Sequence, residues 1–269
     1  MAELHMNFFS PTLYTNTDLK IILPTPNSYE YDEPGGMDYF RPGVKYQVLY
    51  LLHGLAGDYT HWTRYSSIER YAQDRRLLVV MPSAGNSFYQ DMALGGAYLT
   101  YLTEELPRFI RAIFPVTGKR EDTFIAGLSM GGYGAVKCAF HAPEQYGACA
   151  SLSGALDVPS LLTKLDADPG QTRLWQAVFG DVHAAAEGEA NLYVLAQKRL
   201  AEGRSLPPVF QTIGTEDYLY ENNRLAREKF TEMGLALTYT EHPGIHFWTF
   251  WDQYIQEALD WLPLKKDVL

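Results

Sequence analysis

The sequence has little of what marks disulfide-rich or membrane-spanning proteins. It contains two cysteines, Cys138 and Cys149, too few for a disulfide framework, and their apolar surroundings predict free thiols in a reducing compartment. No apolar run approaches the roughly 18 residues of a membrane span. The N-terminal segment has no basic stretch followed by an apolar core, as a signal peptide would. We therefore expect a cytoplasmic protein with no membrane partner.

Positive charge is scarce as well. The chain carries 22 Lys and Arg residues against 32 Asp and Glu residues, a net charge of -10. Because phosphate backbones are bound mainly by Lys and Arg, a nucleic-acid partner is not expected. A hydrophobic content of 46% in 269 residues is enough to predict one globular domain over residues 1–269. The aromatic-rich edges leave homo-oligomer formation open.

Short apolar runs alternate with helix-period stretches along the chain. Continuous apolar runs are typical of strands that are covered on both faces, and strands alternating with helices predict an α/β fold with a mostly parallel central sheet flanked by helices. The segment at about 155–206 has helical pieces but no convincing strand, so we expect a small helical cap-like insertion there. The predicted strands lie at 19–24, 46–54, 77–82, 123–127, 147–154, 207–214 and 235–241, and the helices at 98–114 (with a kink at Pro107), 133–142, 221–234 and 248–262.

One serine stands among glycines where a predicted strand gives way to a predicted helix. Gly127-Leu128-Ser129-Met130-Gly131 fits the pattern G-x-S-x-G, in which a nucleophilic serine occupies a sharp turn between strand and helix. Such a tight turn leaves no room for Cβ atoms two residues before and after the serine. A glycine-rich turn with an incidental serine is the plain alternative. A phosphate-binding loop is disfavoured because no Lys-Ser or Lys-Thr pair follows.

A serine nucleophile needs a histidine base, and in this architecture the histidine follows the last strand. His242 and His246 both do so. We expect His246 to be the base, because Gly244 precedes it closely and an aromatic helix follows it. His242, directly after the strand and before Pro243, is expected to be a structural or rim residue.

The orienting carboxylate should follow an earlier strand. Asp217 is the preferred residue because a short side chain suits a fixed hydrogen bond to imidazole, and Glu216 is the alternative. Asp217 could also merely cap the following helix. Asp252 is expected to be a solvated or capping charge.

The remaining parts of the site are an oxyanion hole and an apolar pocket. The backbone amides of Met130 and Leu55 are the expected oxyanion donors, since Met130 follows the nucleophile and Leu55 lies in the loop after an apolar strand. His53 is expected to organise that loop. Aromatic residues near the strand ends are expected to line a pocket for small acyl groups, although each could equally pack in the core: Trp62, Phe88, Tyr89, Tyr218, Phe247 and Trp248.

The chain resembles the esterase D branch of the α/β-hydrolases, and within it the bacterial tributyrin esterase (EstA-like) members. The resemblance covers nearly the whole chain, including "YLLHGLAGDYTHW", "GLSMGGYGA", "GTEDYLYENN" and "GIHFWTFWD". It implies an α/β-hydrolase fold, hydrolysis of short-chain acyl esters, in some members of acetylated or feruloylated sugars, and no metal or organic cofactor. Ser129, Asp217 and His246 fall on the triad positions of that family.

The predicted function is therefore that of a serine carboxylesterase acting on small ester substrates. S-formylglutathione hydrolases share the branch, but they typically carry a cysteine near the oxyanion loop and a histidine at the position of Tyr133. Similar mycolyltransferases indicate that acyl transfer to an alcohol is also possible on such a site. A binding module that has kept the fold and lost the chemistry is the alternative from another class.

Overall fold

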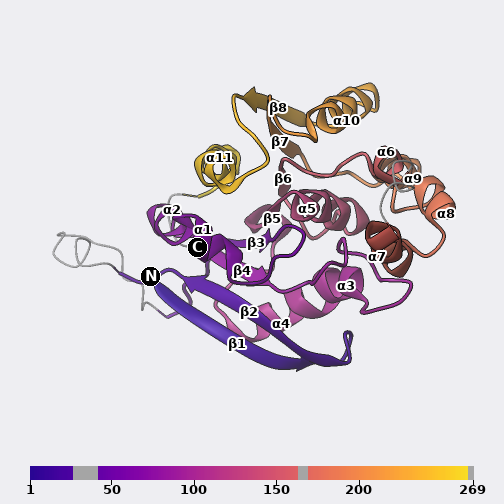
Figure 1. The fold of residues 1–269 in the computed structure, drawn as a ribbon. Helices are drawn as coiled ribbons and strands as arrows, with labels where there is room; N and C mark the ends of the chain where they lie inside the picture. Colours follow the sequence, from indigo (N-terminus) through magenta and orange to yellow (C-terminus); the bar gives the residue numbers. More distant parts are fainter. Residues whose placement is uncertain (27–41, 163–168, 266–269) are drawn as a thin grey trace.

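The computed structural model describes residues 1–26, 42–162 and 169–265, and its centre is an eight-stranded sheet (Figure 1). The strand order is β1-β2-β4-β3-β5-β6-β7-β8. The six strands from β4 to β8 in this order run parallel, and the β1–β2 hairpin adds two antiparallel strands at one edge. The strands are β1 (Ala2–Ser10), β2 (Thr15–Leu23), β3 (Val48–Leu52), β4 (Leu78–Pro82), β5 (Thr123–Leu128), β6 (Ala148–Leu152), β7 (Val209–Gly214) and β8 (Leu237–His242).

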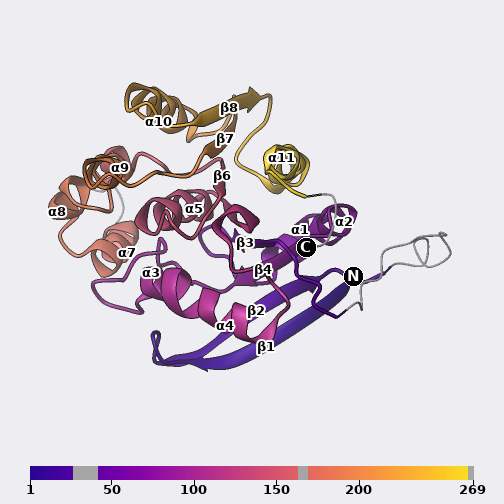
Figure 2. The same cartoon turned by 180° about the vertical axis from the view of Figure 1, so that it is seen from behind.

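Helices cover both faces of this sheet, as Figures 1 and 2 show from opposite sides. One face packs against α1 (His61–Tyr65), α2 (Ile68–Asp74) and α11 (Trp248–Trp261). The other packs against α3 (Tyr98–Thr100), α4 (Leu106–Ile113), α5 (Met130–His141) and α10 (Tyr220–Glu232). The predicted α/β architecture with a mostly parallel sheet is confirmed by the parallel pairing of the central strands and by the helices on both faces. Strands β3 to β7 are also wholly buried, as their continuous apolar runs predicted.

The first strand of the hairpin was not predicted. β1 alternates between half-buried and exposed residues, and it lies at the edge of the sheet, where only one face packs on the core. A continuous apolar run was therefore not needed there. β2 begins at Thr15, four residues before the predicted run at 19–24.

The helical stretch predicted at 98–114 is three consecutive pieces. A π-helical segment, Tyr101–Glu105, separates α3 from α4, and Pro107 lies in the first turn of α4. Proline has no N–H to donate and is therefore tolerated in the first turn of a helix. The π-helical segment ends just before this turn, so the lost hydrogen bond falls where α4 begins. The predicted interruption is present, but it takes the form of a π-helical segment.

The described part of the chain between β6 and β7, the segment predicted as a cap-like insertion, contains four helices. They are α6 (Val158–Leu162), α7 (Pro169–Phe179), α8 (Val182–Glu187) and α9 (Leu192–Ala201), and part of the predicted insertion, residues 163–168, lies outside the described residues. Phe88 packs its ring against Trp175 and Phe179 of α7, with ring centroids 4.5 and 5.8 Å apart. Lys137 of α5 donates from Nζ to the Glu189 carbonyl at 2.6 Å. These contacts fasten the insertion to the sheet layer.

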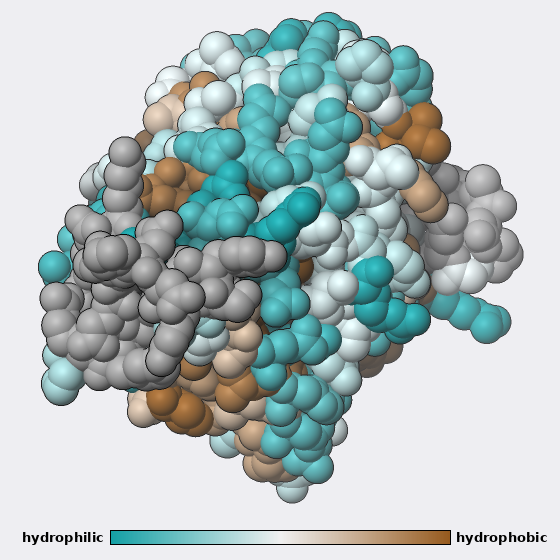
Figure 3. Space-filling model, turned by 90° about the vertical axis from the view of Figure 1, so that its left-hand side faces the viewer, coloured by the Kyte–Doolittle hydropathy of each residue, from teal (hydrophilic) through white to brown (hydrophobic). Residues whose placement is uncertain are grey.

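The surface on the α2 and α11 side is largely hydrophilic. Figure 3 shows this side, and outside the grey atoms its hydrophobic residues form small separate patches. Both cysteines are buried free thiols, as predicted, and burial raises the pKa of Cys138 to about 12. No helix in the described part of the chain has both the length and the apolar character to cross a membrane.

Candidate functional site

The backbone at Ser129 is strained in the way a nucleophile turn requires. Ser129 stands between the last residue of β5 and the first of α5, with φ 53° and ψ -119°. A conformation of this kind costs of order 1–3 kcal/mol and persists only where the surroundings impose it. A Cβ at Gly131 would lie 2.5 Å from the carbonyl oxygen of Leu52, and one at Gly127 would overlap the Gly131 backbone. The two glycines are therefore required by close backbone approach.

Ser129, His246 and Asp217 form one chain of hydrogen bonds at the carboxyl edge of the sheet. His246 Nε2 lies 2.9 Å from Ser129 Oγ, and His246 Nδ1 lies 2.8 Å from Asp217 Oδ2. The Asp217 side chain is fully buried, and its Oδ1 also accepts the Leu219 amide at 2.8 Å. Leu219 is the residue before α10, so this bond fixes the loop, and the α10 N-terminus has no side-chain cap from Asp217.

The loop that carries His246 is fixed by contacts with the loop after β7. Glu216 accepts the Gly244 amide at 2.5 Å and donates its own amide to the Gly244 carbonyl at 3.1 Å. The Gly244 amide is also the main cause that holds the pKa of the Glu216 carboxyl below its usual range. Glu216 therefore positions the histidine loop, and its carboxylate is bound to backbone. This arrangement disfavours Glu216 as the orienting acid.

Two aromatic rings flank the imidazole of His246. The centroid of the Tyr218 ring lies 4.5 Å away, and that of Trp251 lies 4.9 Å away, edge-on. Trp251 donates from Nε1 to Ser153 Oγ at 3.1 Å, which fixes the indole. Neither Trp251 nor Ser153 was predicted as a site residue. The three- and four-residue periodicity of α11 put Trp251 on its buried face, and only chain folding brings that face to His246.

The two rejected candidates have structural partners. His242 Nε2 lies 2.9 Å from Glu257 Oε2, and its ring stacks on Tyr254 at 4.1 Å. Asp252 accepts the Ser67 amide at the start of α2 at 2.8 Å, together with the Tyr71 hydroxyl at 3.1 Å. Both side chains therefore join elements of the fold away from Ser129, as expected of a structural histidine and a capping carboxylate.

The predicted oxyanion donors belong to two segments that adjoin Ser129. Met130 is the first residue of α5, so its amide has no acceptor within the helix. The loop after β3 approaches the serine closely, since a Cβ placed on Gly54 would lie 3.5 Å from Ser129 Cβ. Leu55 follows Gly54 in that loop, and its side chain is 45% exposed. Both segments therefore lie next to the serine, and the oxyanion role of the two amides remains a prediction.

His53 holds this loop through both ring nitrogens. The Ala84 amide donates to Nε2 at 3.0 Å, so Nδ1 carries the proton and donates to the Gly54 carbonyl at 2.7 Å. The Tyr89 hydroxyl donates to the His53 carbonyl at 2.7 Å. Burial is the main cause that lowers the pKa of His53 to about 4. The ring is therefore a neutral structural element of the oxyanion loop.

His53 should make the protein lose stability in acid. The unfolded chain binds a proton at this histidine below about pH 6.5, whereas the folded protein resists protonation until about pH 4. The contribution of His53 to the free energy of unfolding is therefore fully present above pH 6.5. It is lost as the pH falls toward 4, and the loss is on the order of 3 kcal/mol. Urea unfolding should give a smaller decrease from pH 7 to 4 for His53→Gln than for the wild type. The control His183→Gln, at another exposed histidine, should keep the wild-type decrease. Equal decreases in all three proteins would contradict this role.

Three of the six expected pocket aromatics are core residues. Trp62, Phe88 and Tyr89 have exposures of 1%, 4% and 0%, and the indole of Trp62 donates to the Leu52 carbonyl at 3.0 Å. Their buried rings pack beneath the loops and the insertion. These three residues were expected to line the acyl pocket, and the structure places them in the core instead. The other three are accessible: Tyr218 and Phe247 are exposed, and Trp248 is half-buried.

No metal-binding arrangement was found in the part of the chain that the structure describes. Within residues 1–26, 42–162 and 169–265, no group of three or more His, Cys, Asp or Glu side chains is placed to hold an ion. The chemistry that the described site can offer is that of a strained serine, a histidine, a buried carboxylate and adjacent backbone amides.

Comparison with known proteins identifies the family. The family model described as "Putative esterase" matches residues 13–262. The acetyl esterase of Caldicellulosiruptor saccharolyticus is 32% identical over 275 residues, covering 99% of this chain and all of that protein. Two Staphylococcus aureus structures, each 32% identical, superpose over 97% of this chain and 98% of theirs: the fluorophosphonate-binding serine hydrolase FphF (TM-score 0.85) and the S-formylglutathione hydrolase FrmB (TM-score 0.82).

The similarity thus extends over the sheet, the insertion and the site together. A match of this length cannot come from a shared motif alone. The chain belongs to this esterase family and is a carboxylic ester hydrolase with the α/β-hydrolase fold.

Proposed function

We propose that the protein is a serine carboxylesterase that hydrolyses short-chain acyl esters through an acyl-enzyme on Ser129. The observation that carries the proposal is the hydrogen-bond chain from Asp217 through His246 to Ser129, with distances of 2.8 and 2.9 Å. A serine hydroxyl becomes an effective nucleophile only when such a base accepts its proton. The strained backbone of Ser129 supports the same role, because it points the hydroxyl out of the turn.

In the first half of the reaction, Ser129 Oγ attacks the ester carbonyl carbon as His246 Nε2 accepts its proton. Asp217 holds Nδ1 and stabilises the imidazolium that forms. The carbonyl oxygen becomes an anion and accepts hydrogen bonds from the Met130 and Leu55 amides. His246 then gives its proton to the departing alcohol oxygen, and the acyl group remains on Ser129.

In the second half, water takes the place of the alcohol. His246 accepts a proton from the water as its oxygen attacks the acyl carbon, and the same amides bind the second oxyanion. The carboxylic acid leaves when Ser129 recovers its proton from His246. The ester and one water molecule balance the two steps, with Ser129 and His246 returned to their starting states.

Acyl groups from acetyl to butyryl are the proposed range. The relative that is similar over its full length is named an acetyl esterase, and the accessible aromatic residues Phe247 and Trp248 lie close to His246 in the chain. Tributyrin-type activity and hydrolysis of acetylated or feruloylated sugars fall within this proposal.

A thioesterase acting on S-formylglutathione is the second candidate, because FrmB is described as an S-formylglutathione hydrolase and has a TM-score of 0.82 with this chain. Ser129, His246 and Asp217 could serve a thioester equally well. A non-catalytic binding module is disfavoured, since such a protein would have no use for a strained serine hydrogen-bonded to a buried His–Asp pair.

A chain-length series separates these possibilities. We expect kcat/KM for p-nitrophenyl acetate and butyrate to exceed that for the octanoate at least tenfold, with S-formylglutathione hydrolysed less efficiently than the acetate. Highest activity on S-formylglutathione would favour the thioesterase. Absence of hydrolysis of every ester would contradict the carboxylesterase.

A further inference from the structure

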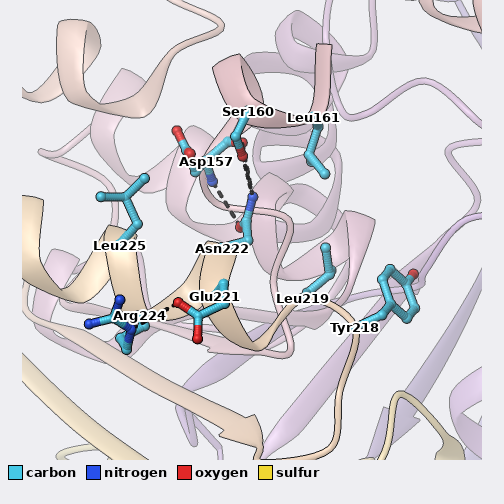
Figure 4. Close-up of a pocket in the computed structure, with 9 residues that line it drawn as sticks. All are labelled: Asp157, Ser160, Leu161, Tyr218, Leu219, Glu221, Asn222, Arg224 and Leu225. Carbon is cyan, nitrogen blue, oxygen red and sulfur yellow. Dashed lines mark hydrogen bonds and ion pairs between the residues drawn. The ribbon is translucent and has the colours of Figure 1, made fainter. Parts of the chain in front are cut away.

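A cavity of about 380 Å³ lies between the loop and helix α6 that follow β6 and the first turns of α10 (Figure 4). Its volume lies within the range of small-molecule pockets, at the small end. Both segments that form it leave the carboxyl ends of adjacent parallel strands, where ligands collect in open α/β sheets. The wall nearest the triad is Tyr218, whose ring centroid lies 4.5 Å from that of His246.

Tyr218 connects this cavity with the reacting atoms. Its ring packs on the imidazole, and partial desolvation, with the nearby Asp217 charge, raises its pKa. In the proposed reaction the alcohol oxygen must lie next to His246 Nε2 to receive the proton. An alcohol larger than ethanol can therefore extend from that point past Tyr218. We propose that this cavity is the subsite for the alcohol part of the ester, an inference that rests on the proposed function.

The walls of the cavity are fixed before any ligand arrives. Asn222, which is 9% exposed, donates from Nδ2 to the Asp157 carbonyl at 2.9 Å and to Ser160 Oγ at 3.3 Å. Its Oδ1 accepts the Asp157 amide at 3.0 Å, so α10 and the loop after β6 are joined in both directions. A subsite made in advance loses less conformational entropy when a ligand binds.

The chemistry of the walls favours a neutral alcohol that carries several hydroxyl groups. Leu161, Leu219 and Leu225 supply apolar surface for the carbon skeleton, and the Glu221 carboxylate supplies polar acceptors for hydroxyls. The subsite thus combines a largely apolar cavity with a few fixed polar groups, as small-molecule sites do.

The charges at the rim disfavour an anionic alcohol. Arg224 is shared by two carboxylates, Glu221 at 3.0 Å and Glu228 at 2.9 Å, so these three side chains together carry a net negative charge. The whole chain is also acidic, with a net charge of -10. A leaving group with its own carboxylate meets repulsion there, and this includes the glutathione thiol, which carries one net negative charge.

The test uses two esters that differ in charge far from the reacting bond. The first, 6-O-acetylglucitol, has a neutral open-chain leaving alcohol; the second, 6-O-acetylgluconate, has the same open chain with a carboxylate at carbon 1. For the wild type at low salt we expect kcat/KM to be roughly fivefold higher for the neutral ester. In 1 M NaCl this ratio should approach one, because salt screens exposed charges.

A charge-reversal variant and a matched control localise the effect. Glu221→Lys should lower the neutral-to-anionic ratio at least roughly fivefold, since it reverses the charge on the wall of the subsite. The control Glu232→Lys makes the same change at the other end of α10, about 16 Å away along the helix. Glu232 is likewise an exposed carboxylate with an ion-pair partner three residues away, Lys229. The control should change the ratio less than twofold.

Ethyl acetate separates failure of the subsite from failure of the proposed function. If ethyl acetate is hydrolysed but the ratio is the same in the wild type, in Glu221→Lys and in Glu232→Lys, the esterase stands and the subsite is overturned. An equal shift in both variants would also overturn it, because the effect would then be one of overall charge. If none of the three esters is hydrolysed, the proposed function itself fails.

Discussion

Replacing Ser129 with alanine is expected to lower kcat for p-nitrophenyl acetate by roughly 10⁵- to 10⁶-fold, as removal of the nucleophile does in another serine hydrolase. The reason is that no other described hydroxyl lies in the hydrogen-bond chain of His246 and Asp217. Steady-state release of p-nitrophenol measures the loss. The protein should still fold, because alanine keeps the Cβ and removes only the hydroxyl.

The control for this variant is Ser205→Ala, at an exposed position outside the site. It should retain wild-type kcat, and both variants should unfold within a few degrees of the wild type. If Ser129→Ala kept more than about a hundredth of the wild-type kcat while folded, Ser129 could not be the nucleophile.

Asp217→Asn should lower kcat by about 10⁴-fold, the loss seen when the acid of another triad becomes an amide. The carboxylate of Asp217 accepts a hydrogen bond from the His246 Nδ1–H group, whereas the NH2 group of asparagine can donate to Nδ1 and so favours the wrong imidazole tautomer. It also removes the buried negative charge that stabilises the imidazolium. Steady-state kinetics with p-nitrophenyl butyrate, with far-ultraviolet circular dichroism to verify folding, measures this effect.

The adjacent carboxylate is the comparison for this prediction. Glu216→Gln should cost no more than about tenfold in kcat, because the Glu216 carboxylate accepts the Gly244 amide and not the imidazole. A larger loss from Glu216→Gln than from Asp217→Asn would exchange the two roles and contradict the assignment of the orienting acid.

The parts of the site that the sequence could predict are those that depend on chain order and strand ends. Ser129, Asp217 and His246 each follow a strand, and parallel strands place their carboxyl ends at one edge of the sheet. The sequence alone therefore predicts that these three distant residues lie close together. The close backbone approach at Gly127 and Gly131 was also predictable, because only a residue without a Cβ fits there. The central strands were predictable because burial on both faces requires continuous apolar runs.

The parts that were missed depend on which face of an element meets which neighbour. Trp62 and Tyr89 stand near strand ends, as pocket residues would, yet their polar atoms donate to the backbone carbonyls of Leu52 and His53 inside the core. Trp251 contacts His246 only because α11 packs beside the β7 and β8 loops. An aromatic side chain has the same sequence signal in a core and in a pocket, so packing alone decides between them.

The most direct test of the central claim is covalent labelling of the serine. A fluorophosphonate reacts only with a serine that a neighbouring base activates, and the structurally similar FphF is described as fluorophosphonate-binding. Intact-mass analysis of the purified protein, followed by peptide mapping, should give one adduct per chain, on Ser129, and none in His246→Ala over the same time. The absence of an adduct in the wild type, or its attachment to another residue, would contradict the account.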